Sequence, residues 1–185
     1  MHRIEALEII VQVRGNDLIV CNIGDPSREL FSVRDAPNQF YMLGSMGMAS
    51  SIGLGIALAR PDRSVVAIDG DGAVLMNLGT LATIADQRPE NYLLVIIDNG
   101  VYGSTGGQPT CTARMADLAS IATGAGMRDV RVVRNEDELR SAFRSMASGV
   151  LVIRVDTMGT DGPIIDIPTR QIVDRFMAEC QRLSM

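Results

Sequence analysis

The sequence contains no lysine and no tryptophan, and its only histidine is His2. All 17 basic residues are therefore arginines. The absence of lysine excludes Schiff-base aldolases, pyridoxal phosphate lysine enzymes and the phosphate-binding loop that ends in Gly-Lys-Ser/Thr. A single histidine beside the N-terminus argues against Ser-His-Asp or Cys-His catalysis and against a histidine-rich metal site. Catalysis must then come from carboxylates, from the backbone or from a cofactor.

Cysteine and long apolar runs are also scarce. The three cysteines, Cys21, Cys111 and Cys180, are far apart, which fits neither a disulfide framework nor a zinc cluster and predicts free thiols in a cytoplasmic protein. No stretch of about 18 apolar residues could span a membrane, and no signal peptide precedes the first helix. Because no apolar run is long enough, we expect no membrane partner. Acidic residues outnumber basic ones by 22 to 17, so we expect no nucleic-acid partner either.

The 185 residues fit a single domain, 1–185, and their apolar periodicity alternates between helix and strand. This alternation predicts an α/β fold with an open, mostly parallel sheet and helices on both faces. Strands are expected over 18–23, 64–69, 92–98 and 150–156. Helices are expected over 2–14, 46–59, 75–88, 114–124, 136–146 and 172–180, with a loop at 25–28 between the first strand and a short segment at 40–43. In the 75–88 helix, the inward face is expected to carry Leu75, Leu78, Ala82 and Ala85.

The first informative motif is Gly70-Asp71-Gly72, which directly follows one expected strand. Ligands of open parallel sheets bind beyond the carboxyl ends of the strands, where a helix N-terminus offers free N–H groups to phosphate. Gly72 and Ala73 would supply those groups. The tripeptide alone is a weak signal, because tight turns between strands and helices often contain glycine and aspartate.

A second polar segment, from Asp98 to Gly103, follows the next strand and places Asn99 28 residues beyond Asp71. One crossover helix and one strand fill this gap, so the Asp71 carboxylate and the Asn99 amide oxygen are expected at the same edge of the sheet. Mg2+ prefers oxygen ligands and usually keeps phosphates and water in its shell. Asp71, Asn99 and a carbonyl near Val101 are therefore predicted to be the protein part of a Mg2+ site that a diphosphate completes.

These segments resemble the thiamine diphosphate enzymes, whose motif is Gly-Asp-Gly, a gap of this size and then Asn-Asn or Asp-Asn. The resemblance implies thiamine diphosphate and Mg2+ as cofactors, with Asp71, Asn99 and Val101 as metal ligands. The segment 44–47 resembles the element that holds the aminopyrimidine ring, through the Gly44 carbonyl and a bulky Met46 that bends the cofactor. The cofactor-binding residues implied are Gly44, Ser45, Met46, Gly70, Asp71, Gly72, Ala73, Asn99, Val101, Tyr102 and Gly103.

Complete enzymes of this type have a second, pyrimidine-binding domain with an activating glutamate. The first expected strand begins near residue 18, which leaves no room for that domain. We therefore expect a separate alpha subunit to supply it, with the cofactor at the interface between the two chains. Self-association of the chain is also expected.

Over most of its length the chain is similar to the beta subunits of sulfopyruvate decarboxylases, which serve coenzyme M biosynthesis in archaea, and to phosphonopyruvate decarboxylases. The segments that carry the similarity are 22–24, 26–30, 41–47, 76–83 and 102–108. The phosphonopyruvate enzymes are typically single chains with both domains, so chain length favours the sulfonate enzymes. The resemblance implies that 3-sulfopyruvate, a small 2-oxo acid, is decarboxylated to sulfoacetaldehyde, with the thiazolium ring accepting the electrons.

No residue in the chain is a certain catalytic group. The candidates for binding the sulfonate are Arg28, after the first strand, and the hydroxyls of Ser104 and Thr105 in the glycine-rich loop. Each has a structural alternative: Arg28 could anchor its loop through Glu29 or a carbonyl, and the two hydroxyls could cap a turn.

Two other functions remain open. One is a decarboxylase of phosphonopyruvate or another 2-oxo acid, or an acetolactate synthase-like subunit, with the same cofactor. The other is a regulatory nucleotide-binding module in which Gly-Asp-Gly is only a turn. The segment 53–55 does not continue into a dinucleotide fingerprint, which disfavours the second alternative.

Overall fold

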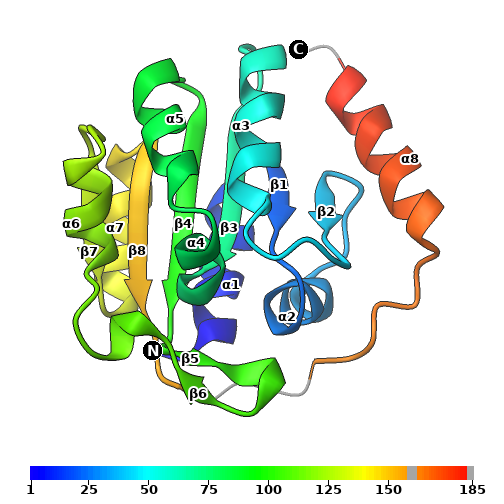
Figure 1. The fold of residues 1–185 in the computed structure, drawn as a ribbon. Coiled ribbons are helices and arrows are strands. Elements are labelled where there is room, and N and C mark those ends of the chain that lie inside the picture. The colour runs from blue at the N-terminus through cyan, green and yellow to red at the C-terminus, as the bar shows by residue number, and fades with distance from the viewer. Residues whose placement is uncertain (158–161, 183–185) are drawn as a thin grey trace.

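The computed structural model describes residues 1–157 and 162–182. At its centre is a six-stranded sheet with the order β2-β1-β3-β4-β8-β7, and all neighbouring strands in it are parallel. Helices cover both faces of this sheet (Figure 1). The predicted α/β fold with a parallel sheet is confirmed. Among the residues described, no helix is both long and apolar enough to span a membrane.

The elements alternate along the chain as the sequence pattern predicts. The strands of the main sheet are β1 (Leu18–Cys21), β2 (Gln39–Tyr41), β3 (Val65–Gly70), β4 (Tyr92–Asp98), β7 (Val130–Val133) and β8 (Gly149–Arg154). The helices are α1 (Arg3–Arg14), α2 (Asp25–Val33), α3 (Ala49–Ala59), α4 (Asp71–Met76), α5 (Gly79–Gln87), α6 (Leu118–Gly124), α7 (Glu136–Ser145) and α8 (Thr169–Gln181). A small antiparallel hairpin, β5 (Val101–Tyr102) and β6 (Gln108–Pro109), follows β4.

The sheet separates the core into two layers, because its central strands are buried on both faces. Helices α1, α2 and α7 pack on one face, where Leu7, Leu30 and Phe143 join one apolar cluster. Helices α3 to α6 pack on the other, where Leu54 and Leu81 join a second cluster. Burial on both faces explains why the strands have continuous apolar sequences instead of alternating ones.

The chain leaves β1 and β3 in opposite directions across the sheet. From β1 it passes through α2 to β2 at one edge, whereas from β3 it passes through α4 and α5 to β4 on the other side. Strands β1 and β3 are themselves neighbours, with Cys21 beside Ile68. The gap between their carboxyl ends is therefore a topological switch point, where open parallel sheets form a crevice for ligands.

The helix predicted between β3 and β4 is in fact two helices, and two of the four residues of its predicted inward face are exposed. The helix is interrupted at Asn77, whose side-chain Nδ2 donates to the Gly47 carbonyl at 3.0 Å. The break shifts the helical phase, so that Leu78 is 38% exposed and Ala82 is also exposed. Of the predicted inward residues, Ala85 is buried and Leu75 is partly buried against the core. Val74, Leu81 and Ile84 are buried beside them.

Two other local predictions are corrected. The segment 25–28 is the first turn of α2 and not a loop; Pro26 in that turn is compatible with a helix start, where its missing N–H is not needed. Helix α6 begins at Leu118 and not at Arg114, because Asp117 caps it by accepting from the Ser120 N–H at 2.6 Å. Asn135 caps α7 in the same way, because its Oδ1 accepts from the Glu138 N–H at 2.9 Å.

Candidate cofactor site

A cavity of about 170 Å³ lies at the carboxyl edge of the sheet, at the switch point between β1 and β3. Segments that are distant in sequence form its wall: the start of α1, the turn after β1, Met46, the β3–α4 junction and the segment from β4 into the hairpin. Nine of the predicted cofactor-binding residues line it: Met46, Gly70, Asp71, Gly72, Ala73, Asn99, Val101, Tyr102 and Gly103. Gly44 and Ser45 do not line this cavity and are exposed.

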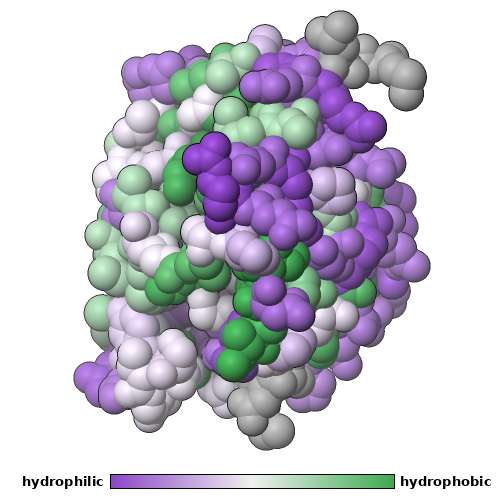
Figure 2. Space-filling view, turned by 90° about the vertical axis from the view of Figure 1, so that its right-hand side faces the viewer, coloured by the Kyte–Doolittle hydropathy of each residue, from purple (hydrophilic) through white to green (hydrophobic). Residues whose placement is uncertain are grey.

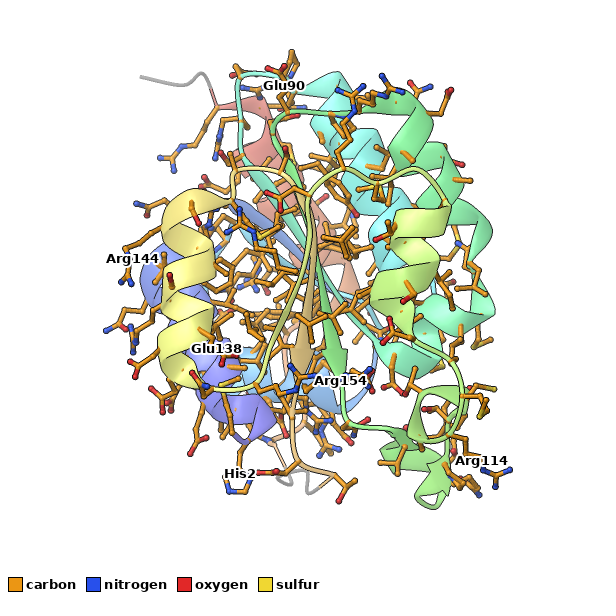
Figure 3. The ribbon with its side chains drawn as sticks, turned by 90° about the vertical axis from the view of Figure 1, so that its left-hand side faces the viewer. His2, Glu90, Arg114, Glu138, Arg144 and Arg154 are labelled. Atoms are coloured by element: carbon orange, nitrogen blue, oxygen red, sulfur yellow. The ribbon has the colours of Figure 1, made fainter. Side chains whose placement is uncertain are left out.

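A larger cavity, of about 290 Å³, lies at the opposite edge, where Tyr92 begins β4 and Gly149 begins β8. None of the predicted site residues lines it. Figure 3 shows the two ends of the sheet: Glu90 marks the end with this larger cavity, and Arg154 marks the carboxyl edge. The chemistry-bearing residues therefore gather at the smaller cavity.

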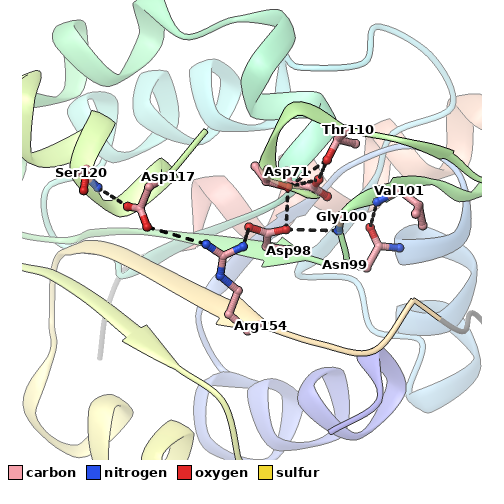
Figure 4. A network of polar contacts seen from close by, with 10 residues as sticks. Asp71, Asp98, Asn99, Gly100, Val101, Thr110, Asp117, Ser120 and Arg154 are labelled. Atoms are coloured by element: carbon pink, nitrogen blue, oxygen red, sulfur yellow. Dashed lines mark hydrogen bonds and ion pairs between the residues drawn. The ribbon is translucent and has the colours of Figure 1, made fainter. Parts of the chain in front are cut away.

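Asp71 is the most constrained polar residue of the site. It is 2% exposed and begins α4. The hydroxyls of Thr110 and Thr112 both donate to its Oδ2, at 2.5 Å and 2.9 Å (Figure 4). Within the described part of the chain, no hydrogen bond goes to Oδ1, so the carboxylate is held by one oxygen and keeps the other for a ligand.

Asp98 lies next to Asp71 and links it to a wider network (Figure 4). Its Oδ1 accepts from Thr112 at 2.9 Å, and its Oδ2 pairs with Arg154. Burial raises the pKa of Asp98, and the nearby charge of Asp71 adds to this, while the bond from Thr112 and the charge of Arg154 oppose it. Thr112 therefore bridges two carboxylates that would otherwise repel each other.

Asn99 and Val101 lie on the cavity wall with Asp71. The Asn99 Oδ1 accepts from the Val101 N–H at 3.2 Å, which fixes the turn after β4. No group of three or more His, Cys, Asp or Glu side chains that could hold a metal occurs in the residues described. Any metal bound here must therefore take much of its shell from amide or backbone oxygens, water and ligand.

Glycine at position 72 makes room for the Tyr102 ring. A Cβ at Gly72 would lie 2.3 Å from Cε1 of Tyr102, which no real side chain tolerates. The tyrosine of the hairpin thus packs directly on the first turn of α4. This contact joins the two halves of the Gly-Asp-Gly and Asp-Asn motif in space.

The loop 44–48 is anchored to α4 at one point. Gly47 has a φ of +87°, and a Cβ there would lie 2.8 Å from the Ala73 carbonyl oxygen, so glycine is required on both counts. Asn77 of the helix break also donates to the Gly47 carbonyl. The break in the predicted helix therefore has a role: it holds this loop beside the cavity.

Asp69 fixes the helix that follows the same loop. It is fully buried, and its Oδ2 accepts from the Ser50 N–H in the first turn of α3 at 3.0 Å. Its Oδ1 has no partner among the described residues. Burial raises the pKa of Asp69 to about 7, although the bonds from Ser50 oppose the shift.

This raised pKa predicts a pH-dependent stability. The unfolded chain has the ordinary aspartate pKa of about 4, so between pH 4 and 7 the folded state binds the extra proton. The free energy of unfolding should then fall as the pH rises through this range, by at most about 1.4 kcal/mol per pH unit. In Asp69→Asn this dependence should vanish, as urea denaturation of the cofactor-free protein at pH 5 to 8 would measure. The exposed control Asp86→Asn should keep the pH dependence of wild type. If the free energy of unfolding of Asp69→Asn falls with pH as steeply as that of wild type, the prediction is contradicted.

Arg3 is a cavity residue that sequence reasoning missed. It comes from the first turn of α1, and its Nε and Nη2 donate to Glu29 of α2 at 2.6 Å and 2.8 Å. Asp25 lies 3.7 Å from the same guanidinium. Burial by itself would lower the pKa of Arg3. The hydrogen bond to Glu29 and the negative charge of Glu29 outweigh burial, so the pKa of Arg3 is raised.

The chain matches a known family over the part that forms this cavity. The C-terminal TPP binding domain of thiamine pyrophosphate enzymes matches residues 22–155, which include the β3–α4 junction and the hairpin. The chain belongs to the thiamine pyrophosphate enzyme family. Thiamine pyrophosphate and thiamine diphosphate are the same compound.

Individual relatives differ in how much of their own length is matched. Sulfopyruvate decarboxylase subunit beta of Methanothermobacter thermautotrophicus is 46% identical over 182 residues, which cover 97% of this chain and 95% of that one. Phosphonopyruvate decarboxylase of Streptomyces hygroscopicus is 40% identical over 170 residues, which cover 91% of this chain but 39% of that one. In fold, the chain resembles the 4-hydroxybenzoylformate decarboxylase of Rhodococcus jostii, with a TM-score of 0.68, 22% identity and coverage of 85% of this chain and 32% of that one.

The cavity of this thiamine pyrophosphate enzyme domain fits the diphosphate end of the cofactor. Asp71 offers an unengaged carboxylate oxygen, and the first turn of α4 offers N–H groups beside it, as helix starts do. Asn22 also lies on the wall, and its side-chain Oδ1 is buried without a hydrogen-bond partner among the described residues. The donor set is mainly oxygen and N–H, which suits an anionic ligand carried with a hard cation.

Two of the three residues predicted to bind the sulfonate line this cavity of the thiamine pyrophosphate enzyme domain. Ser104 and Thr105 line it, but the Thr105 hydroxyl is engaged within its own loop by Gln108 at 3.2 Å. Arg28 lies outside, on the wall of a neighbouring cavity of about 240 Å³, and its Nε donates to the Pro163 carbonyl at 3.2 Å. The geometry therefore favours the structural alternative for Arg28, which was to anchor its segment through a carbonyl.

The lining residues that sequence reasoning missed are Arg3, Asn22, Ile23, Asp25, Pro26 and Ile97. Those at 22–26 had a usable signal, because they directly follow an expected parallel strand. Arg3 had none, since only the packing of α1 brings it to this edge.

Proposed function

We propose that the chain is the beta subunit of a thiamine pyrophosphate-dependent sulfopyruvate decarboxylase, which converts 3-sulfopyruvate to sulfoacetaldehyde and CO2. The observation that carries this proposal is the 46% identity to such a subunit over 95% of its length. The cavity supports it, because its residues suit the diphosphate end of the cofactor. Coenzyme M biosynthesis, an archaeal source and a cytoplasmic location belong to this proposal and rest on resemblance.

In the proposed site, Asp71, the Asn99 amide oxygen and the Val101 carbonyl hold Mg2+, and the diphosphate completes its shell. Charge balance supports the metal. Among the described lining residues, Arg3 is the one cationic side chain, and Glu29 already pairs with it. The negative charges of a diphosphate and of Asp25 and Asp71 would repel one another unless a divalent cation were bound between them.

When bound, thiamine pyrophosphate supplies a thiazolium ring that accepts the electron pair released as CO2 leaves. The residues of this chain bind and orient it. Met46, on the cavity wall, would hold the bent form of the cofactor, and the Gly44 carbonyl would accept from the aminopyrimidine. Tyr102, packed on Gly72, would form the wall of the site on the hairpin side.

The proposed partner is a separate alpha subunit that supplies the pyrimidine-binding domain and its activating glutamate. Exposed apolar side chains beside the cofactor loop support such an interface: Met48 is 41% exposed and Met76 is 63% exposed. Both surround Asn77, whose Nδ2 lies 3.8 Å from the Met48 sulfur. Apolar surface also gathers at the lower centre of the face in Figure 2, and Leu43, just after β2, is 57% exposed. Self-association of the complex is proposed as well.

Reconstitution tests the proposed function. The chain would be expressed alone and together with an alpha subunit from the same source, and CO2 release would be measured with thiamine pyrophosphate and Mg2+. The pair is expected to decarboxylate 3-sulfopyruvate, while the chain alone is expected to be inactive. A pair that decarboxylates phosphonopyruvate or pyruvate, but not 3-sulfopyruvate, would contradict the assigned substrate and leave the family intact.

A phosphonopyruvate decarboxylase is the second candidate function. The observation in its favour is the 40% identity to such an enzyme, although that relative is matched over 39% of its own length. The same substrate comparison separates the two, because sulfonate and phosphonate differ in charge at neutral pH.

The bridging role of Thr112 predicts a loss of metal affinity on substitution. Thr112→Val removes the hydroxyl that orients Asp71 and Asp98 but keeps the side-chain shape. We expect the apparent Kd for Mg2+ of the reconstituted complex to rise about tenfold or more, as for other residues that orient a metal ligand. Calorimetric titration of Mg2+ in the presence of thiamine pyrophosphate measures it. Thr112→Ser should restore the affinity, and the exposed control Thr123→Val should not change it. An unchanged apparent Kd for Mg2+ in Thr112→Val would show that Thr112 does not orient Asp71 for metal binding.

A further inference from the structure

Arg154 is a basic residue at the carboxyl edge of the sheet that does not line the cofactor cavity. It is the last residue of β8 and lies beside Asp98 in the register of β4 and β8. Its Nη1 pairs with Asp98, and its Nη2 lies 3.8 Å from Asp117, which caps α6 (Figure 4). Arg154 therefore joins the end of β4 to the start of α6.

Of these two acidic partners, Asp98 is the one that depends on the cation. The Asp98 side chain is 1% exposed, whereas that of Asp117 is 52% exposed. Asp71, a second buried carboxylate, lies next to Asp98. Two carboxylates repel each other more strongly when water is excluded, so the ion pair with Arg154 offsets the repulsion at this point of the site.

Asp98 is in contact with both halves of the proposed metal site. Its Oδ1 accepts from the Thr112 hydroxyl at 2.9 Å, and the same hydroxyl is bonded to Oδ2 of Asp71. Oδ1 also accepts from the Gly100 N–H at 3.2 Å, within the turn that carries Asn99. One carboxylate thus holds both the partner of Asp71 and the turn after β4.

The two oxygens of Asp98 have separate partners. Oδ1 bonds to Thr112 and to the Gly100 N–H, and Oδ2 pairs with Arg154. Of the residues that the structure describes, Arg154 is the one that donates to Oδ2. Without the guanidinium, the carboxylate can rotate about its Cβ–Cγ bond, and its repulsion from Asp71 is no longer offset. The bonds on Oδ1 would then lose their fixed geometry.

We propose that Arg154 is a positioning residue for the Mg2+ site, which acts through Asp98 and contacts neither the metal nor the cofactor. This inference rests on the proposed function, because it takes the site as one that holds Mg2+. It gives a role to Asp98, a buried carboxylate that is not itself a predicted metal ligand. It also adds β8 to the strands that form the site, next to β3 and β4.

The first test replaces Arg154 in the reconstituted complex and titrates Mg2+ by calorimetry in the presence of thiamine pyrophosphate. Arg154→Met keeps the length of the side chain and removes its charge and its donors. We expect the apparent Kd for Mg2+ to rise about 10- to 100-fold, the usual effect of losing a residue that orients a metal ligand. Arg154→Lys keeps the positive charge, and its apparent Kd should lie between those of wild type and Arg154→Met.

A double-mutant cycle shows whether Arg154 acts through Asp98. Asp98→Asn keeps an oxygen acceptor for Thr112 and for the Gly100 N–H, but its side chain is neutral and needs no cation. In this background, Arg154→Met should leave the apparent Kd for Mg2+ nearly unchanged. The double variant contains no unpaired buried charge, so the comparison remains possible even where Arg154→Met alone folds poorly. The Tm without ligand is measured for each protein.

Two controls isolate the contact with Asp98. Asp117→Asn removes the charge of the other acidic partner and should not change the apparent Kd for Mg2+. Arg131 is the matched arginine: it lies on β7 and pairs with Asp129 at 3.0 Å, away from the cavity. Arg131→Met should bind Mg2+ as wild type does. A loss in Asp117→Asn as large as that in Arg154→Met would overturn the assignment to Asp98.

The possible results separate this inference from the proposed function. If wild type binds Mg2+ with thiamine pyrophosphate and Arg154→Met binds Mg2+ equally tightly, the role of Arg154 is overturned and the proposed function stands. An equal loss in the wild-type and Asp98→Asn backgrounds also overturns it. If wild type does not bind Mg2+ and thiamine pyrophosphate, the proposed function fails, and the inference fails with it. A loss in Arg154→Met that disappears in the Asp98→Asn background supports the inference.

Discussion

Replacing Asp71 by alanine is expected to abolish Mg2+-dependent binding of thiamine pyrophosphate and to lower decarboxylation well over a hundredfold. The loss should exceed the roughly 10- to 100-fold effect of removing a residue that only orients a metal ligand. Asp71 is held at the cavity by two threonine hydroxyls on one oxygen, which leaves the other oxygen for the proposed cation. In the described part of the cavity wall, no other carboxylate is oriented in this way.

Calorimetry and steady-state rates of the reconstituted complex measure this loss. Folding is checked by circular dichroism, and it should persist, because Thr112 can still bond to Thr110 and to Asp98. Asp71→Asn serves as a second variant that keeps an acceptor for both threonines but lacks the charge. The exposed control Asp86→Ala should behave as wild type. Retained Mg2+-dependent binding in both Asp71 variants would remove Asp71 from the metal site.

Replacing Glu29 by leucine is expected to cost about 3–5 kcal/mol of unfolding free energy, because it leaves the Arg3 guanidinium buried without its main partner. The side chains of Arg3 and Glu29 are 7% and 1% exposed. Asp25, at 3.7 Å, compensates only in part. Arg3→Met should also destabilise, since it leaves the Glu29 carboxylate buried. The double variant should be close to wild type, because replacing both partners of a buried ion pair by apolar groups is often neutral or stabilising.

Urea denaturation of wild type, the two single variants and the double variant forms the cycle that measures the coupling. The control is the exposed pair Arg170 and Asp174, whose side chains are 86% and 57% exposed. Asp174→Leu should change the unfolding free energy by less than about 1 kcal/mol. Additive losses in the Arg3 and Glu29 cycle would mean that the two residues stabilise the fold independently.

Much of the site follows from sequence spacing. Gly70-Asp71-Gly72 and Asn99 each end a strand with a continuous apolar sequence, and the gap between them holds one crossover. Because crossovers in parallel sheets return the chain to the same edge, this spacing places both polar segments together. Both line one cavity in the structure, and their roles as metal ligands remain predictions.

Other features of the structure are hard to predict from the sequence. Strand β7 is short and lies at the edge of the sheet, with partly exposed side chains and an arginine, so its apolar pattern is diluted. The break at Asn77 depends on a bond to Gly47, far away in the sequence, and no local propensity encodes it. Thr110 and Thr112 read as ordinary loop residues until the hairpin folds back onto Asp71.

The sequence by itself determined the fold class and the two polar segments of the site, because apolar periodicity and crossover length are local properties of the chain. Only the tertiary structure decided which residues complete the wall. Strand order brings Asn22 beside β3, and the packing of α1 brings Arg3 to Glu29. These contacts join residues that are distant in sequence, and their energies depend on burial, which a linear pattern does not record.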